Sequence, residues 1–451
     1  MATTAGALRQ QHQQPLVVQP LQHQQRVERE QQRHLRQQQL QESVHGVGCG
    51  PNLYNKEIMV RLDDLYTVYK LARANKRRSE DAVVFEIDYE AKLSRLLTRI
   101  NERTMRCDHN YAFISKCPQP REVFGSEFES RMIQWYVVWR MSAIFENELS
   151  ERTFNNRIGM GVEAAVNNVI DDIRTASRGF TRPAYAIQWD LQGCFPNANC
   201  DIALAKLRKL MRQYEGDDKE DLEWMALIAI HANPQRHFYR KSAIEEWGLI
   251  KPEKSLLNKD DGTGGVIGFH LWQTTMNIYY SDIDHWAVDE MGLLYTRFMD
   301  DTIMVVEDKE AALTLLPLFR EKYKEVGSTM HPRKFSCQEV AKGVKFLGSY
   351  IKGDRVYIAN RTLRKARSRI GELNLCKGKL GKLDQFISTM NSYFGLLKNK
   401  NEFRNIECLW GMVGDGWKAY AEMDWDRLCV VAREGYKHND FINYKFRRIY
   451  A

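Results

Sequence analysis

The sequence lacks any hydrophobic run long enough to cross a membrane. Its longer apolar stretches are short pieces such as Met225–Ala232, MALIAIHA, whereas a membrane-spanning helix needs about 20 apolar residues. The N-terminus also lacks the apolar segment of a signal peptide. We therefore expect a cytoplasmic protein without a membrane partner.

Cysteine is present but has no pattern. Nine cysteines are scattered over 451 residues without a CxxC pair or a Cys/His cluster. Structural zinc sites and disulfide frameworks both need such spacing. The sequence therefore predicts neither, and the scattered thiols favour a reducing compartment.

Composition limits the class of protein further. A chain with 43% hydrophobic and 27% charged residues can form two or three globular subdomains. The formal charge of +8 suits a polyanionic partner but also suits many ordinary basic proteins. Residues 1–48 are rich in Gln, His and Arg, so they cannot bury a core. This tail is interpreted either as a disordered appendage or as an arm that contacts RNA or a partner.

Two adjacent aspartates, Asp300 and Asp301, lie between apolar runs in YTRFMDDTIMVV. A strand, two aspartates and a second strand often form no more than a solvated turn. Alternatively, a tight hairpin can hold two hard oxygen ligands for divalent cations at its tip. A third carboxylate is needed to choose between the two interpretations.

Asp190 provides that third carboxylate. Ala184–Trp189 alternate as a strand does and end on Asp190, and either Asn199 or Asp201 can cap the helix that follows. Between Asp190 and Asp300 lie helical segments and a glycine-rich loop. After Asp301 the sequence predicts a helix, a short basic turn (HPRKFS) and a hairpin (VKFLGSYIKGDRVYI). This order predicts an α+β fold with a ferredoxin-like antiparallel sheet.

Such a sheet suits two-metal phosphoryl transfer. One cation lowers the pKa of a primer 3′-hydroxyl and the other binds the incoming triphosphate. We expect Asp190 and Asp300 to be ligands, together with the backbone carbonyl of Leu191, and Asp301 to be their acidic neighbour.

Three further residues near this centre have both a structural and a functional interpretation. Phe195 is either a core residue or a ring beneath the nucleotide sugar that excludes a 2′-hydroxyl. Gly268 either starts a helix or lets the backbone approach a base pair or template closely, where Gln273 would hydrogen-bond it.

The motifs together resemble those of reverse transcriptases. AIQWDLQGCF, GGVIGFHLWQTTMNIYYSDID, YTRFMDD, HPRK and KFLGSYI have the family's order and approximate spacing, and upstream PQPREVFGSEFESRMIQ and RTFNNRIGMGVEAA resemble its fingers motifs. The resemblance covers most of residues 85–370. It implies a right-hand polymerase that copies template RNA from a primer into cDNA, using deoxynucleoside triphosphates and two Mg²⁺ ions, with Mn²⁺ as an alternative.

The same resemblance implies a division of the chain. Residues 49–175 would form the N-terminal region and mainly helical fingers, and residues 176–358 the palm, with fingers or palm helices between Asp190 and Gly264. Residues 359–451 would form a helical thumb and a basic C-terminal segment.

Within the family, the chain is most similar to the bacterial or phage reverse transcriptases of diversity-generating retroelements. The corresponding positions are Ile267, Gly268, Gln273 and Asn277. That group implies error-prone copying opposite adenine and a small basic accessory protein. Trp272 replaces a small serine of the pattern, which predicts altered template contacts, and Phe298 replaces the commoner tyrosine.

Other basic residues acquire roles by the same comparison. Arg121 and Arg131 would meet the nucleotide triphosphate or the template, since arginine binds phosphate through two parallel hydrogen bonds. Lys334 would lie near the leaving pyrophosphate, and Arg157 and Gly161 would line the template entrance. Taken singly, each of these charges is also explained as ordinary surface charge.

A basic stretch follows the predicted sheet. Its charges are Arg361, Arg364, Lys365, Arg367 and Arg369. A helix with this row can straddle the backbone of a template–primer duplex, so that binding weakens steeply with salt. A solvated helix face gives the same pattern.

Three rival functions stay open. A phage-defence or retron-like reverse transcriptase keeps the polymerase and changes its biology. A non-catalytic RNA-binding or assembly protein with a retained palm belongs to another class, although three carboxylates around one point argue against it. A palm-bearing nucleotidyl cyclase leaves the fingers region and the basic stretch without a role.

Overall fold

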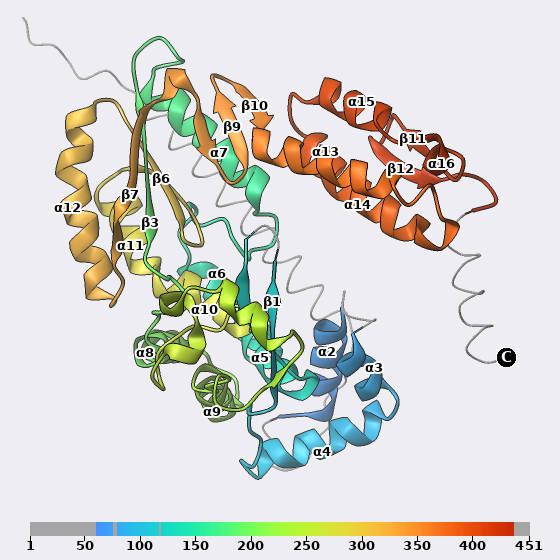
Figure 1. Cartoon of the computed structure of the whole chain (residues 1–451). Coiled ribbons are helices and arrows are strands. Elements are labelled where there is room, and N and C mark those ends of the chain that lie inside the picture. Colours follow the sequence, from blue (N-terminus) through green and yellow to red (C-terminus); the bar gives the residue numbers. More distant parts are fainter. Residues whose placement is uncertain (1–59, 75–78, 117–118, 437–451) are drawn as a thin grey trace, which may run out of the picture. The chain divides into compact units, whose positions relative to one another are not determined.

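The computed structural model describes residues 60–74, 79–116 and 119–436 (Figure 1). The prediction for the Gln-rich tail and that for the last residues of the basic C-terminus lie outside the described residues. Among the described residues, none of the helices is both long and apolar enough to span a bilayer.

The first helices are amphipathic, as their spacing predicts. Helix α2 buries Leu65, Val68 and Tyr69, which recur at helical intervals, and it packs against α5. The helices of this region are α2 (Leu62–Arg73), α3 (Glu80–Glu86), α4 (Tyr89–Asn101), α5 (Phe128–Arg140), α6 (Ser142–Glu148) and α7 (Val162–Ala176).

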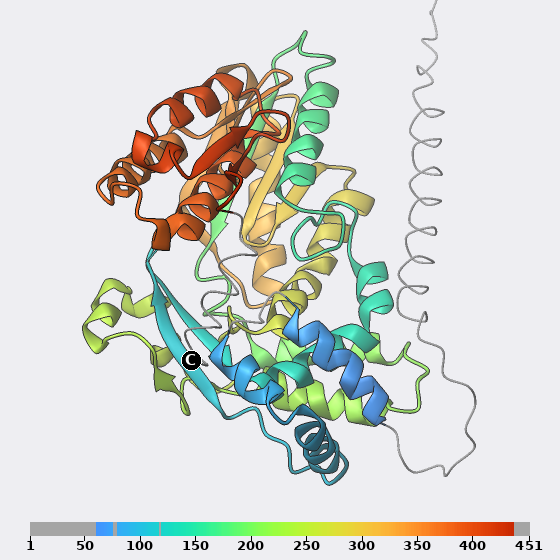
Figure 2. The ribbon, with the colours of Figure 1, turned by 90° about the vertical axis from the view of Figure 1, so that its right-hand side faces the viewer.

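A small sheet precedes α5. Strands β1 (Asn110–Ser115) and β2 (Arg121–Ser126) are antiparallel, and β4 (Tyr239–Arg240) joins the other edge of β1 in parallel. Figure 2 shows β1 and β2 as a pair of long cyan strands. Residues of β1 alternate between buried and half-buried, because successive side chains of a strand point to opposite faces. One face of the sheet therefore packs on the core and the other meets solvent.

The main sheet has four antiparallel strands in the order β5-β6-β3-β7. They are β3 (Tyr185–Leu191), β5 (Leu294–Phe298), β6 (Asp301–Val306) and β7 (Met330–Glu339). Helices connect β3 to β5, and α12 (Lys309–Glu325) connects β6 to β7. This βαββαβ order is the ferredoxin-like arrangement, so the predicted fold class is confirmed.

Both faces of this sheet are covered. On β3, Ile187 and Trp189 belong to the core that contains Phe319 of α12, whereas Ala186 belongs to the core that contains Val169 of α7. Between β3 and β5 lie α8 (Cys200–Met211), α9 (Lys219–Ile230), α10 (His270–Tyr279) and α11 (Ser281–His285), with short helical turns η1 (Ile244–Leu249), η2 (Pro252–Lys254), η3 (Leu256–Asn258) and η4 (Trp286–Glu290). The side chain of Asn199 caps α8, as predicted.

The prediction of a short basic turn at HPRKFS is wrong. These residues lie inside β7, which pairs with β3 from Tyr185↔Glu339 to Leu191↔Met330. Because β7 is an edge strand, it tolerates Pro332, which cannot donate a ladder hydrogen bond. The hairpin predicted after it is part of a three-stranded antiparallel sheet, β8 (Val344–Phe346), β9 (Ser349–Lys352) and β10 (Arg355–Ile358), preceded by η5 (Val340–Lys342).

The C-terminal elements have a core of their own, which includes Phe386 stacked on Trp417 at 4.5 Å between ring centroids. The elements are α13 (Asn360–Asn374), η6 (Leu380–Lys382), α14 (Leu383–Leu397), α15 (Phe403–Gly411), α16 (Asp415–Lys418), β11 (Ala421–Asp424) and β12 (Cys429–Ala432). The region is mainly helical, as expected, but the β11–β12 hairpin was not predicted.

Gly268 joins the small sheet to the start of α10. A Cβ atom on Gly268 would lie 2.0 Å from the carbonyl oxygen of Phe124 in β2, far inside van der Waals contact. The backbones of the glycine-rich loop and of β2 therefore meet directly.

We predict opposite effects of the same substitution at two glycines. Gly268→Ala forces these backbones apart and should destabilise the protein by about 1–3 kcal/mol or more. Gly371→Ala, on a helical residue whose added Cβ meets nothing within 4 Å, should stabilise it by about 0.5–1 kcal/mol. Denaturant midpoints of the two variants check this, and a Gly268→Ala midpoint equal to that of the wild type would contradict the contact.

Candidate active site

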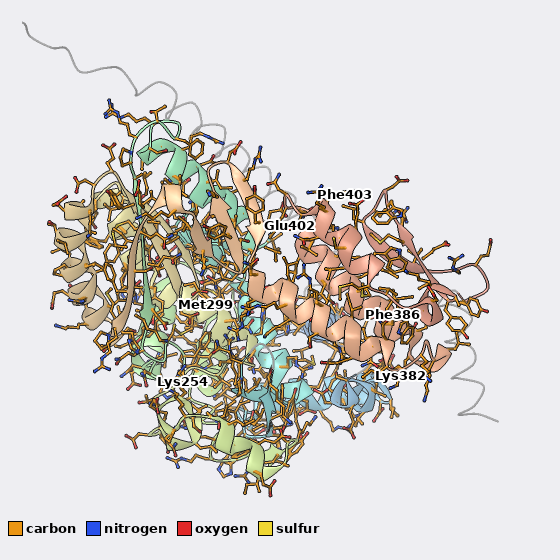
Figure 3. The ribbon with its side chains drawn as sticks, turned by 45° about the horizontal axis from the view of Figure 1, so that its top comes forward. Lys254, Met299, Lys382, Phe386, Glu402 and Phe403 are labelled. Atoms are coloured by element: carbon orange, nitrogen blue, oxygen red, sulfur yellow. The ribbon has the colours of Figure 1, made fainter. Side chains whose placement is uncertain are left out.

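A tight hairpin presents the two adjacent aspartates. Strands β5 and β6 pair up to Phe298↔Asp301, so only Met299 and Asp300 form the turn. Met299 has φ +61°, because two-residue hairpin loops need left-handed backbone. Its N–H donates to Oδ1 of Asn155 at 2.8 Å, and Asn155 is buried. Figure 3 labels Met299 at this tip.

Asp190 lies beside this tip at the end of β3. Trp189 of β3 pairs with Thr302 of β6, which places Asp190 next to Asp301 in the neighbouring strand. On the other side of β3, Lys334 of β7 forms an ion pair with the Asp190 carboxylate. The structure thus brings together the three predicted carboxylates and the predicted lysine.

Burial and, after it, repulsion between carboxylates raise pKa values at the site. Burial raises the pKa of Asp300, and the charge of Asp190 raises it further. Burial of its carboxyl, followed by the charges of Asp300 and Asp190, raises the pKa of Asp301 to about 6, although the residue as a whole is exposed. Arg121 acts in the opposite direction on both carboxyls, and Lys254 acts so on Asp300.

These two cations come from distant parts of the sequence. Arg121 begins β2 and is exposed, as its predicted role requires. Lys254, at the end of η2 (Figure 3), was missed by sequence reasoning, because one lysine in an exposed turn has no distinctive pattern.

The donor set fits hard divalent cations. Carboxylate oxygens are their preferred protein ligands, and a bound cation would offset the repulsion that, together with burial, raises these pKa values. Within the described residues, no three His, Cys, Asp or Glu side chains form a ready-made metal site, and Asp190 is engaged by Lys334. The residues that would hold the ions are Asp190, Asp300 and Asp301. The Leu191 carbonyl, at the end of β3, stays a prediction.

A cleft of about 370 Å³ opens beside the carboxylates. Asp190, Asp301 and Lys334 line one part of it, and Lys345 and Leu347 of the β8–β9 region line another. The cleft is polar at the carboxylates and partly apolar at Phe335 and Phe346. It leaves room for a ligand next to the hairpin tip.

The glycine-rich loop covers the turn after β3. The Phe195 carbonyl accepts a hydrogen bond from the N–H of Gly265 at 2.6 Å, and the Phe195 ring would lie 3.2 Å from a Cβ on Gly265. Phe195 is half-buried, so its ring both packs against this loop and reaches the surface. The predicted sugar gate stays a prediction.

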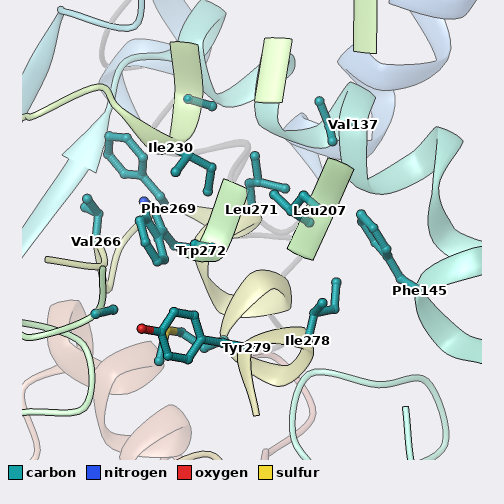
Figure 4. Packing of buried hydrophobic residues seen from close by; sticks show 14 of the residues in the cluster. Val137, Phe145, Leu207, Ile230, Val266, Phe269, Leu271, Trp272, Ile278 and Tyr279 are labelled. Carbon is teal, nitrogen blue, oxygen red and sulfur yellow. The ribbon is translucent and has the colours of Figure 1, made fainter. Parts of the chain in front are cut away.

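The three residues expected to meet a base pair or template are used inside the protein. Gly268 contacts β2, and the Gln273 side chain donates to the Ile267 carbonyl at 3.0 Å. Trp272 is fully buried among Phe269, Val266 and other core residues (Figure 4). The Trp272 ring thus packs in the core, and the expected change in template contacts at this position stays a prediction.

Two predicted nucleic-acid contacts are also internal. The side chain of Arg157 is 1% exposed. It donates to the Glu146 carboxylate at 3.0 and 3.1 Å and to two backbone carbonyls at 2.7 Å. Arg131 pairs with Asp81 at 2.7 Å, and both side chains are largely buried. Both charges are therefore neutralised internally in this structure, and the predicted roles of the two side chains stay predictions.

The positions of Gly161 and of the basic stretch are compatible with the nucleic-acid contacts predicted for them. Gly161 precedes α7 with φ +151°, and an added Cβ would meet nothing within 4 Å. The basic stretch lies on α13, opposite the buried side chains Leu363, Ala366, Ile370 and Leu373. Arg361, Arg364, Lys365 and Arg367 are exposed, whereas Arg369 is half-buried and pairs with Glu372 at 2.6 Å. Their nucleic-acid roles stay predictions.

A buried ion pair beneath the hairpin was not foreseen. Arg297 of β5 and Asp284 of α11 are both 0% exposed and hydrogen-bonded at 2.8 and 3.0 Å. Arg297 also donates to the carbonyl of Met299 at 3.3 Å. The available signal was an arginine in the middle of an otherwise apolar strand.

Comparison with known proteins gives one family and a set of distant structures. The model of the family described as "Reverse transcriptase (RNA-dependent DNA polymerase)" matches residues 125–351, about half of the chain. A search of curated proteins found no match.

Three telomerase structures are among the matches. Apo telomerase of Candida tropicalis without its C-terminal domain is 12% identical, with a TM-score of 0.38, over 56% of this chain and 55% of that one. The apo telomerase of Candida tropicalis is 12% identical, with a TM-score of 0.39, over 69% and 60%. Telomerase of Candida albicans with a TWJ fragment of telomeric RNA is 9% identical, with a TM-score of 0.39, over 73% and 64%. This chain therefore spans less than two thirds of the length of each of them.

The raised pKa of Asp301 predicts a pH-dependent stability difference. A folded-state pKa of about 6 against 3.8 means that this carboxyl stabilises the fold below pH 3.8 and that the stabilisation is lost as the pH rises through 6. With a chelator present, Asp301→Asn should therefore raise the melting temperature by about 1–3 °C at neutral pH and should have no effect below pH 3.8. Thermal unfolding across this range tests the prediction.

The control for this experiment is Asp171→Asn on α7, which removes one exposed carboxylate that pairs with Arg174. An equal gain for both variants, or a gain for Asp301→Asn that does not change with pH, would contradict repulsion at the hairpin tip.

Proposed function

The chain belongs to the reverse transcriptase family, and from this premise we propose that it extends a primer on an RNA template as an RNA-directed DNA polymerase. The main support is that Asp190 lies close to Asp300 and Asp301 at one end of the sheet. These residues are more than a hundred positions apart in the sequence. A chain that did not need these carboxylates would gain stability by losing one of them.

We assign the metal-binding role to Asp190, Asp300 and Asp301, with the Leu191 carbonyl. Mg²⁺ or Mn²⁺, when bound, would lower the pKa of the primer 3′-hydroxyl and neutralise triphosphate charge. Arg121 and Lys254 contribute positive charge at the same carboxylates, where they would orient the triphosphate. Lys334 is held at Asp190 and would be released toward the leaving pyrophosphate when that carboxylate takes another partner.

The first test is incorporation of deoxynucleotides on an RNA template with an annealed DNA primer in the presence of Mg²⁺. The double variant Asp300→Ala with Asp301→Ala should lower the rate by about a thousandfold or more, since it removes the charge that organises the reacting groups. Single-turnover extension, followed by gel electrophoresis, measures it.

The control variant also removes two negative charges, from the helix α12 that packs on the same sheet. Glu321→Ala with Glu325→Ala deletes two exposed carboxylates of α12 that pair with neighbouring lysines, and should retain activity. Absence of wild-type incorporation on any template would favour the non-catalytic RNA-binding protein. Equal activity of the wild type and the hairpin variant would remove the metal assignment.

We further propose that the protein makes cDNA for a diversity-generating retroelement, in the cytoplasm of a bacterium or phage-infected cell. The support is the sequence pattern Ile267, Gly268, Gln273 and Asn277. In the structure these residues fix the loop before α10, and Asn277 donates to the Asn155 carbonyl at 2.8 Å, next to the hairpin support. This role adds a small basic accessory protein and a structured template RNA as partners.

The error spectrum tests this finer proposal. Sequenced cDNA from a defined RNA should carry substitutions mainly opposite template adenines, at a frequency at least about tenfold above that opposite the other bases. A faithful or unbiased spectrum from an active enzyme would instead favour the retron-like or phage-defence alternative and would leave the polymerase assignment intact.

A further inference from the structure

Glu122 of β2 is a buried carboxylate that binds one other segment of the chain. Its Oε1 accepts hydrogen bonds from the indole N–H of Trp247 at 2.8 Å and from the hydroxyl of Ser255 at 2.9 Å. Its Oε2 accepts one from the backbone N–H of Leu256 at 2.6 Å. All three donors belong to residues 244–258, which run from η1 to η3 and which we call the η1–η3 segment. The chemistry proposed for the hairpin tip does not use this carboxylate.

The η1–η3 segment has little apolar support of its own. It buries only Ser255 and Leu256, and its other residues are exposed or half-buried. Segments with few buried apolar contacts open at a low free-energy cost, so polar contacts determine where this one lies. An ion pair of Glu246 with Lys116 at 2.9 Å ties down its beginning, in η1. Glu122 holds the part directly after η2, through hydrogen bonds to a charged group, which are stronger than those between neutral groups.

A cation precedes each side of this contact in the sequence. Arg121 comes directly before Glu122, and Lys254 comes directly before Ser255. Both cations are exposed, and their charges lower the pKa of Asp300 against the effect of its burial. One buried carboxylate therefore fixes the backbone beside two cations that act on the hairpin tip, although these cations are more than a hundred residues apart in the sequence.

Both cations are available to a ligand. Within the described part of the chain, neither Arg121 nor Lys254 forms a salt bridge, whereas Arg131 and Arg157 are neutralised by internal carboxylates. Glu122 does not neutralise its neighbour Arg121, because successive side chains of a strand point to opposite faces. The carboxylate therefore positions the backbone of the two cations and leaves their charges free.

The two cations match the chemistry of a polyphosphate. A guanidinium binds phosphate oxygens through two parallel hydrogen bonds, and an ammonium binds them as a point charge. Cations on a backbone that is already fixed lose less conformational freedom when the ligand binds, which raises its affinity. The firmness of the η1–η3 segment should therefore appear in the affinity for the nucleotide.

We propose that Glu122 is a positioning residue for the incoming nucleotide, because it holds Lys254 at the hairpin tip, where Lys254 and Arg121 together bind the triphosphate. The identity of this ligand rests on the proposed polymerase function. Glu122 itself does not touch the nucleotide, so its effect passes through Lys254. It acts on the binding of the nucleotide and leaves the rate of bond formation unchanged.

The test is a double-mutant cycle on nucleotide affinity, measured without turnover. Full-length protein binds a labelled RNA template with a DNA primer that ends in a dideoxynucleotide, in the presence of Mg²⁺. Excess unlabelled duplex is then added, and the fraction of labelled complex that persists is followed as the concentration of the next complementary deoxynucleoside triphosphate rises. The dissociation constant of the nucleotide follows from this titration.

Lys254→Ala should weaken nucleotide binding by about tenfold, since it removes one phosphate-binding charge. Glu122→Gln keeps the size of the side chain but replaces one acceptor oxygen by a donor, and should weaken binding by about threefold or more. In the Lys254→Ala background, Glu122→Gln should add less than about twofold, because the lysine that it positions is already absent. In primer extension, Glu122→Gln should raise KM for the nucleotide and leave kcat within about twofold.

Lys251→Ala is the matched control, because it removes an exposed lysine from the same segment, and it should keep the wild-type affinity. Ser255→Ala is a milder variant for the case that Glu122→Gln does not fold, since it removes one of the three donors to the carboxylate. It should weaken nucleotide binding by about twofold and add nothing in the Lys254→Ala background. Single effects that multiply in the double variants, or an equal loss for Lys251→Ala, would overturn the proposal.

A failure of this proposal can be told apart from a failure of the polymerase assignment. If the wild type extends primers while the effects of Glu122→Gln and Lys254→Ala multiply, Glu122 has only a structural role and the polymerase assignment stands. If the wild type neither binds a nucleotide nor extends a primer, both proposals are overturned. A lower kcat with an unchanged KM in Glu122→Gln would also contradict the positioning role, since the nucleotide would then bind as it does in the wild type.

Discussion

The buried ion pair between Arg297 and Asp284 is the interaction on which the hairpin tip depends. Two fully buried charges are tolerated only when each one is paired and its remaining hydrogen-bonding groups are satisfied. Asp284 also accepts from the hydroxyls of Tyr295 and Thr153, at 3.0 and 2.7 Å. Arg297 reaches the backbone carbonyl of Met299 in the turn itself. Removing either partner would leave a buried charge, at a cost of about 3–5 kcal/mol.

Rigid support by this ion pair allows three carboxylates to lie close together. Left to relax, Asp190, Asp300 and Asp301 would move apart, and the energy of their repulsion would fall. The hairpin resists this movement because Asn155 holds the N–H of Met299 and Arg297 holds its carbonyl. The repulsion therefore stays in the site, where it adds to burial in raising the pKa values of Asp300 and Asp301 and prepares the site for cations.

What the sequence predicted and what it missed follow from the range of the interactions involved. Periodicity and local turn chemistry predicted the strand that ends on Asp190, the Asn199 cap and the α12 helix, because neighbouring residues decide these features. The internal pairing of the arginines depends on distant partners, which local patterns do not indicate. Arg131 is neutralised by Asp81 and Arg157 by Glu146, and nothing in the arginine motifs themselves indicates those contacts. The local sequence of the HPRK segment predicts a turn, and the segment forms a strand only because β3 pairs with it.

The glycine-rich loop connects the strand that carries the proposed nucleotide contacts with the strand that carries Asp190. At Gly268 its backbone meets Phe124 of β2, and at Gly265 it bonds to the carbonyl of Phe195 in the turn after β3. Strand β2 begins with Arg121 and Glu122, whereas Asp190 lies near the end of β3. The placement of Arg121 relative to the carboxylates is therefore set by backbone contacts through this loop. A substitution in the loop that widens either contact should disturb the carboxylates and the nucleotide contacts together, although no side chain of the loop need touch either one.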